Sequence, residues 1–152
     1  MGYILELRRE LGSRPLIMAG AGVLLINEKN EVLLQKRSDN GLWDYPAGSM
    51  ELGENFEECA RREVFEETGL SCGRLEYFMD ISGKSSYYEY PNGDRTYAAV
   101  IVYICRDFEG ELKAQDSEVI TQRFFPLDAL PAEDDPRGLG IFDRLREYLR
   151  KG

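Results

Sequence analysis

Residues 48–70 read GSMELGENFEECARREVFEETGL, and this segment decides the fold that we expect for the chain. Asn55 is a favoured N-cap residue, and Glu58 follows it at the spacing of a capping box. Gly69 is the residue type that most often ends a helix. The segment therefore predicts a helix of about four turns over residues 55–68.

Three carboxylates interrupt the apolar face of this predicted helix. They are Glu63, Glu66 and Glu67. Helical periodicity places them on or beside the face that Cys59, Ala60 and Val64 define. Carboxylates at this spacing repel one another and lose hydration when buried, so they need a compensating charge. A solvated acidic helix is the alternative interpretation, but the interrupted apolar face argues against it.

The absence of histidine limits the chemistry that the helix can support. The 152 residues contain no histidine, which excludes imidazole-ligated zinc and the Ser-His-Asp and Cys-His nucleophile systems. The three cysteines, Cys59, Cys72 and Cys105, lack metal-site spacing, so we expect free thiols in a cytoplasmic protein. A ligand set made only of oxygen atoms is typical of Mg²⁺ or Mn²⁺, which commonly bridge to phosphates.

Size and charge narrow the class of protein further. A chain of 152 residues with 43% hydrophobic residues predicts a single domain over residues 1–152. The formal net charge of −9 argues against binding to duplex nucleic acid, and no apolar run reaches the length of a membrane-spanning helix. The amphipathic N-terminal segment and an apolar hairpin are compatible with a homodimer.

Hydrophobic patterning predicts an α+β domain with a mixed sheet. Further helices are expected at residues 3–11 and 141–150. Strands are expected at residues 16–26, 31–37, 75–82, 85–90, 95–105, 111–114 and 121–125. Asn92-Gly93 predicts a two-residue hairpin turn. Residues 38–53 are expected to be irregular, and so long a connection before a helix is typical of a functional loop.

Residues 48–70 resemble the Nudix box at each of its fixed positions. The matching residues are Gly48, Glu54, Arg62, Glu63, Glu66, Glu67 and Gly69, with Val64 and Leu70 at the aliphatic positions. The preceding sequence, which includes residues 33–37 and 43–48, is similar to bacterial Nudix hydrolases of the MutT and ADP-ribose pyrophosphatase type. Ala47 departs from the glycine that this family often has there. The resemblance implies a Nudix fold, in which a mixed β-sheet is sandwiched between α-helices (an α/β/α sandwich).

The resemblance also implies a Mg²⁺- or Mn²⁺-dependent pyrophosphohydrolase that cleaves a nucleoside diphosphate linked to another moiety. The substrate would be an NTP, ADP-ribose, a nucleotide sugar or a dinucleoside polyphosphate. The implied metal ligands are Glu63, Glu66, Glu67 and the carbonyl of Gly48. Either Glu63 or the downstream Glu118 would act as the catalytic base, although Glu118 is equally consistent with a solvated loop carboxylate. Glu54 and Arg62 would orient the ligands.

The residues that would contact the rest of the substrate are less constrained. Lys36 and Arg37 end a predicted strand near the loop and could bind phosphate, although Lys36 is equally consistent with a solvated strand end. Tyr88 could stack on a base, or it could pack within the hairpin. Two other functions remain open, namely a non-catalytic regulatory module that binds a nucleotide or metabolite, and action on the 5′ end of RNA. The full set of carboxylates disfavours the first, and the lack of a basic stripe disfavours the second.

Overall fold

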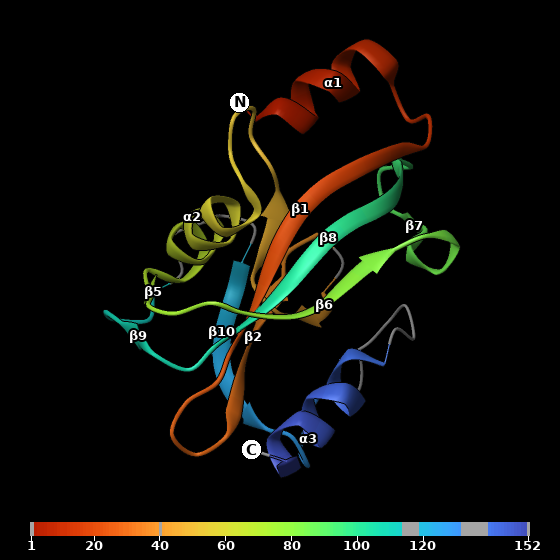
Figure 1. The fold of residues 1–152 in the computed structure, drawn as a ribbon. Coiled ribbons are helices and arrows are strands. Elements are labelled where there is room, and N and C mark those ends of the chain that lie inside the picture. The colour runs from red at the N-terminus through yellow and green to blue at the C-terminus, as the bar shows by residue number, and fades with distance from the viewer. Residues whose placement is uncertain (1, 40, 114–118, 132–139, 152) are drawn as a thin grey trace.

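The computed structural model describes residues 2–39, 41–113, 119–131 and 140–151 (Figure 1). In chain order the elements are α1 (Tyr3–Leu11), β1 (Leu16–Leu25), β2 (Glu31–Arg37), β3 (Trp43–Asp44), β4 (Ala47–Ser49), α2 (Phe56–Thr68), β5 (Ser71–Cys72), β6 (Glu76–Ser82), the 3₁₀ helix η1 (Lys84–Ser86), β7 (Tyr88–Glu89), β8 (Arg95–Cys105), β9 (Phe108–Glu109), β10 (Val119–Pro126) and α3 (Ile141–Lys151). No helix among these residues combines the length and the apolar composition needed to cross a bilayer.

The strands form one mixed sheet and two smaller antiparallel sheets. The mixed sheet has the order β4-β1-β8-β6, and β7 also pairs with β8. Its central pair, β1 and β8, is parallel, with Leu16 opposite Thr96, and its other pairs are antiparallel. A second sheet has the order β10-β2-β3, and β5 pairs with β9. The predicted α+β class and mixed sheet are therefore confirmed, although the strands are divided among three sheets.

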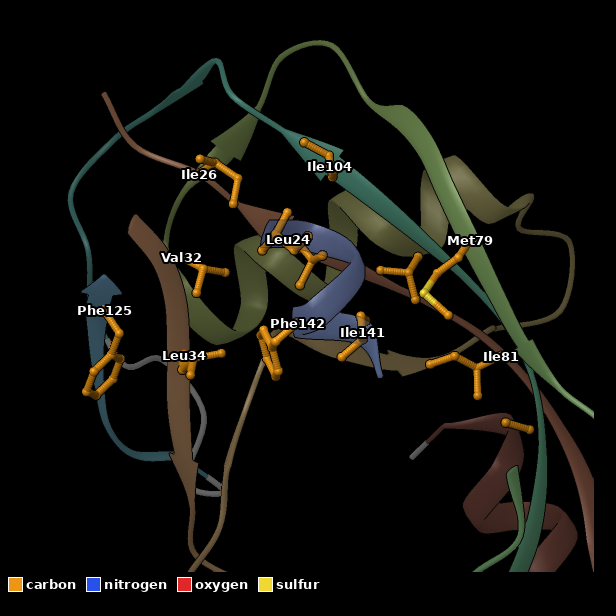
Figure 2. Close-up of a cluster of buried hydrophobic side chains, with 13 residues drawn as sticks. Leu24, Ile26, Val32, Leu34, Met79, Ile81, Ile104, Phe125, Ile141 and Phe142 are labelled. Carbon is orange, nitrogen blue, oxygen red and sulfur yellow. The ribbon is translucent and has the colours of Figure 1, made fainter. Parts of the chain in front are cut away.

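Both faces of β1 are buried from Gly20 to Leu25. Successive side chains of a strand point to opposite sides, so this part of β1 contributes to two cores. Val23 and Leu25 belong to the core beneath α2, whereas Leu24 and Ile26 belong to the core beneath α3. Figure 1 shows α2 and α3 separated by the strands. In Figure 2 the aromatic ring of Phe142 lies between Leu34 of β2 on the left and Ile81 of β6 on the right, with Leu24 of β1 above it. This arrangement is the α/β/α sandwich predicted from the resemblance.

The helix α2 has the ends that its sequence predicts. The Asn55 side chain accepts a hydrogen bond from the Glu58 N–H (2.8 Å), and the Glu58 carboxylate accepts one from the Asn55 N–H (2.9 Å). Gly69 ends the helix in the left-handed conformation, with φ of 81°. The reciprocal cap satisfies two N–H groups that the first turn would otherwise leave without acceptors.

Three of the predicted elements are wrong. Residues 38–53 contain the short strands β3 and β4, which pair with β2 and β1 and so are fixed by tertiary contacts. The expected strand at 85–90 is divided between η1 and β7, and its hairpin loop has three residues because the Tyr90 N–H donates to the Asp94 carbonyl. Residues 111–113 form no strand, and Ala114 lies outside the described residues.

Candidate active site

Two of the three predicted ligand carboxylates on α2 are withdrawn from solvent. The side chain of Glu63 is 15% exposed, and Glu67 is buried with 5% of its surface exposed. The side chain of Glu66 is 52% exposed and lies at the rim. Helical spacing explains the difference, since Glu63 and Glu67 are one turn apart on the face that packs against the sheet.

The two oxygens of the Glu67 carboxyl group differ in their hydrogen bonding to the described residues. Gln35 Nε2, on β2, donates to Glu67 Oε1 at 3.0 Å. Glu67 Oε2 is buried, and no residue that the structure describes forms a hydrogen bond with it. Burial, and then the negative charge of Glu63, raise the pKa of Glu67 from 4.5 to about 9. An unsatisfied buried oxygen next to a second carboxylate is a suitable position for a cation.

Arg62 connects the loop before α2 to the helix. Its Nε donates to Glu54 Oε2 at 2.5 Å, and its Nη2 donates to Glu54 Oε1 at 2.9 Å, which makes a bidentate pair. Nη2 also donates to the Ser49 carbonyl at 2.9 Å. The hydrogen bonds from Arg62 hold the pKa of Glu54 below its ordinary value of 4.5. Glu54 is thus fixed as an anion that positions Arg62.

The remaining nitrogen of the guanidinium group, Nη1, faces the predicted ligand carboxylates. Arg62 Nη1 donates to Glu63 Oε1 at 2.8 Å and to Glu66 Oε2 at 3.2 Å. Burial nevertheless raises the pKa of Glu63, and the nearby positive charge of Arg62 acts against that increase. Hydrogen bonds thus connect Glu54 through Arg62 to Glu63 and Glu66, and the ligand-orienting role of Glu54 and Arg62 stays a prediction.

Gly48 brings backbone close to the carboxylates because it has no side chain. A Cβ atom at Gly48 would overlap the carboxyl group of Glu63. A Cβ atom at Gly20, on the neighbouring strand β1, would overlap the Gly48 carbonyl oxygen. These two positions require glycine for reasons of close approach rather than of backbone angle.

The donor set fits a hard divalent cation. Within the described ranges of the chain, no three acidic side chains already converge closely enough to hold a metal ion. Yet the carboxyl group of Glu63 lies against Gly48 and close to that of Glu67, whose buried Oε2 has no hydrogen-bond partner among the residues with known placement. Carboxylate and carbonyl oxygens without nitrogen or sulfur ligands suit Mg²⁺ or Mn²⁺. Glu66, which pairs with Arg62 at the rim, would have to turn inward to join them.

These carboxylates open into a cavity of about 810 Å³. Its acidic lining residues are Asp39, Asp44, Glu51, Glu63, Glu66, Glu67 and Asp94. Its basic lining residues are Arg8, Arg37 and Arg62. Because acidic groups outnumber basic ones, a polyphosphate could enter only with cations that neutralise the lining.

Of the other predicted contact residues, some line the cavity and some do not. Arg37 and Tyr88 line the cavity, and Arg37 forms an ion pair with Asp39 at 3.0 Å. Lys36 is not among the described residues of the lining, because neighbouring side chains on β2 point to opposite faces. Glu118 lies outside the described residues, so its role as a base stays a prediction.

Sequence reasoning missed two contributors to this region. Gln35 is a polar residue buried in an otherwise apolar strand, and that mismatch was the available signal. The helix α1 contributes Ile4, Leu5 and Arg8 to the cavity lining, and nothing in its own sequence predicts this. All three cysteines are free thiols, as predicted.

Comparison with known proteins places this site in a family context. The family model for the NUDIX domain matches residues 16–145. A Bacillus subtilis (strain 168) protein, provisionally named an 8-oxo-dGTP diphosphatase, is 43% identical over 72 residues, which cover 47% of this chain and 44% of that protein. A NAD-capped RNA hydrolase NudC of Haemophilus influenzae (strain PittGG) is 33% identical over 123 residues, which cover 80% of this chain and 41% of that protein. The chain thus spans less than half the length of these curated relatives.

Solved structures share the fold. The crystal structure of a MutT NUDIX hydrolase from Burkholderia pseudomallei matches with a TM-score of 0.68 and 24% identity, covering 86% of this chain and 97% of that one. A MutT protein from Methanosarcina mazei Go1 matches with a TM-score of 0.65 and 24% identity, covering 91% and 96%. At this level of identity the structural match establishes the architecture alone.

Proposed function

This chain belongs to the Nudix family, and from that premise we propose that it is a divalent-metal-dependent pyrophosphohydrolase acting on a small nucleotide. The observation that carries the proposal is the pair of half-buried Glu63 and buried Glu67, which faces an acidic cavity and in which Glu67 Oε2 has no partner among the described residues. A regulatory module that only binds a nucleotide does not require two adjacent buried carboxylates, whose burial is costly.

Some residues of the site would bind the cation, and others would orient its ligands. Glu63 and Glu67 would hold a cation from the helix, and the Gly48 carbonyl would hold it from the loop. When bound, Mg²⁺ or Mn²⁺ would neutralise the diphosphate and lower the pKa of an attacking water. Gln35 would keep Glu67 in place, and Arg62 would keep the Glu63 carboxylate turned toward the cavity.

The proton acceptor has two candidates in our proposal. Glu63 is oriented by Arg62 and lies beside Gly48, so it could accept the proton from water directly. Glu118 precedes β10, whose residue Gln122 is paired with Gln35, the partner of Glu67. Both assignments keep a carboxylate as the base, which agrees with a chain that has no histidine.

The size and charge of the cavity favour a small nucleotide over duplex nucleic acid. A volume of about 810 Å³ falls within the roughly 300–1,000 Å³ of small-molecule sites. Of the ligands named by the relatives, 8-oxo-dGTP is a small nucleotide and NAD-capped RNA carries a dinucleotide pyrophosphate. The three free thiols agree with a cytoplasmic location.

A substrate panel tests the proposal. The protein would be incubated with 8-oxo-dGTP, dGTP, ADP-ribose, NAD, UDP-glucose and diadenosine tetraphosphate, in Mg²⁺ and in Mn²⁺. Phosphate release would be read directly and after phosphatase treatment. We expect metal-dependent turnover of at least one compound. No turnover in either metal would reject the hydrolase and favour the regulatory binding module.

Replacing one ligand tests the site itself. We expect Glu67→Gln to reduce kcat by more than about 100-fold, because even outer-sphere partners of metal ligands are worth about 10- to 100-fold. The variant should stay folded, since glutamine fills the same volume without a buried charge. Glu57→Gln, on the exposed side of the same helix, should retain full activity as the matched control. Equal activity of the two variants would remove Glu67 from the mechanism.

A further inference from the structure

The helix α1 precedes the segment that the family model matches, yet it lines the same cavity as the carboxylates. The model begins at residue 16, whereas α1 covers Tyr3–Leu11. Gly2, Ile4, Leu5 and Arg8 all line the cavity. Figure 1 shows α1 beside the N-terminal parts of β1 and β8, at the end of the sheet where β7 lies. The cavity therefore has a wall that the family domain alone does not provide.

Polar contacts hold α1 in this position at both of its ends. At its beginning the Tyr3 N–H donates to Glu51 Oε1 at 2.9 Å. In its last turn Arg8 donates to Thr96 Oγ1 at 3.0 Å and to the Arg95 carbonyl, both at the start of β8. Arg8 also forms an ion pair with Asp94 at 3.8 Å, and its side chain is only 11% exposed. The helix is thus tied to the loop before α2 and to the β7–β8 hairpin.

The core does not explain why α1 is held there. None of its residues is buried, and nine residues are too few for a helix that is stable on its own. Leu5 lines the cavity and is 55% exposed. A large apolar side chain left half exposed on a cavity wall can gain burial only when something else fills the cavity.

The two ends of the cavity differ in chemistry. At the α2 end the lining includes Glu63, Glu66, Glu67, Arg62 and Gly48. At the α1 end it includes Ile4, Leu5 and Met18, and Tyr88 comes from β7. The acidic residues there are already engaged, since Asp94 contacts Arg8 and the Ser13 hydroxyl (3.2 Å) and Glu51 accepts from the Tyr3 N–H. An uncharged group with a flat apolar face suits this end, whereas a phosphate does not.

We propose that α1 forms the subsite for the group attached to the pyrophosphate, that this group is a nucleobase, and that Arg8 is the positioning residue that holds α1 in place. The assignment rests on the proposed function for the pyrophosphate at the α2 end. It adds a specificity element that lies outside the matched domain.

Steady-state kinetics test the subsite on whichever panel compound is turned over. Leu5→Ala should raise KM by about tenfold and leave kcat within about twofold, since one altered apolar contact is worth roughly 10- to 200-fold in discrimination. Leu5→Met should restore KM. Leu112→Ala is the matched control, because Leu112 is also exposed, at 38%, and does not line the cavity. An unchanged KM in Leu5→Ala would overturn the subsite.

The role of Arg8 has its own kinetic signature. Arg8→Ala should raise KM for the same compound without changing the metal concentration that gives half-maximal activity. Arg8→Lys should restore KM only in part, because a lysine cannot reproduce the forked contacts with Arg95 and Thr96. A fall in kcat at constant KM would contradict a positioning role in the subsite.

Hydrogen exchange on the unmodified protein gives a readout that needs neither turnover nor a variant. The probes are the α,β-methylene analogues of ADP-ribose and of ATP, whose bridge cannot be hydrolysed, each saturating in Mg²⁺. We expect slower exchange in residues 3–11 together with residues 48–70. Protection of residues 48–70 without α1 would overturn this inference and leave the proposed function intact. Protection of neither segment by either probe would reject both.

Discussion

At the scale of single residues, the site depends on carboxyl groups whose proton affinity burial has changed. Glu67 holds its proton up to a pKa of about 9, whereas Glu54, paired with Arg62, ionises below its ordinary pKa. Near neutral pH and without a bound cation, Glu67 is therefore neutral and Glu54 is negatively charged, although both belong to one motif. The difference arises from their surroundings, because Glu54 is paired with a guanidinium, whereas Glu67 is buried beside the carboxylate of Glu63 and accepts from an amide.

The raised pKa of Glu67 predicts how stability depends on pH. Below pH 4.5 the group is protonated in the folded and unfolded states alike, so its full contribution is present. As pH rises toward 9 only the folded state keeps the proton, so the free energy of unfolding falls by up to about 1.4 kcal/mol per pH unit. Urea titrations in EDTA at pH 5, 7 and 9 would measure this loss.

Two comparisons make the pH experiment specific. Glu67→Gln should weaken the pH dependence, whereas Glu57→Gln should keep it. Mg²⁺ should stabilise the protein more at pH 8 than at pH 5.5, because binding must displace the proton. A wild-type protein whose stability rises between pH 5 and pH 9 in EDTA would show that burial of Glu67 is not the dominant cause.

Gly48 gives a steric prediction at the same scale. In Gly48→Ala the new methyl group would overlap the carboxyl group of Glu63 and displace it or the loop. We expect kcat to fall by more than about 100-fold, since misplacing a catalytic group by about 1 Å costs about that factor. Near-ultraviolet circular dichroism would verify that the core is intact. Wild-type turnover in this variant would show that Glu63 can act from another position.

At the scale of elements, helix and long-strand boundaries were readable from local sequence, whereas short strands were not. The segments Glu31–Arg37 and Arg95–Cys105 were predicted with the bounds that the structure has. Their β-branched and aliphatic residues favour strands whatever the partner. In contrast, Trp43–Asp44 is a strand only because it lies against β2. Pairing of this kind depends on distant residues, so local patterning cannot predict it.

The capping box of α2 gives a prediction about this element. Asn55→Ala removes the acceptor for the Glu58 N–H, and we expect a loss of about 1 kcal/mol in the free energy of unfolding. Urea denaturation would measure it as a lower midpoint with an unchanged m-value. Asn55→Ser keeps a capping oxygen and should lose much less. If the two variants were equally stable, the cap would not be what starts the helix.

For the candidate site too, local sequence predicts some of the residues, and others depend on contacts between distant segments. The spacing of Glu63 and Glu67 predicts that they share a face, and the structure places both there, largely buried. Glu66 was expected beside them, but it pairs with Arg62 at the rim. Gln35 contributes because β2 lies next to α2. The helix α1 contributes because it lies next to the loop before α2. That information exists only in the assembled fold.

At the scale of the whole molecule, part of the formal charge of −9 lies at the cavity. Among the described residues, seven acidic side chains and three basic ones line it, a net −4. The arrangement is unfavourable without cations and favourable with them, so the charge that disfavours duplex nucleic acid is compatible with a metal-bridged nucleotide. A homodimer stays a prediction that the oligomeric state in solution would test.

The parallel pairing of β1 with β8 also has a consequence for how the protein reaches its native state. Leu16 pairs with Thr96, and the 79 residues between them include the whole of α2. A contact so distant along the chain closes late and slowly compared with local helices and hairpins. During synthesis the acidic helix therefore emerges well before the strand that completes the sheet beneath it. The core beneath α2, to which β8 contributes Tyr103 and Cys105, is therefore complete only after β8 has been made.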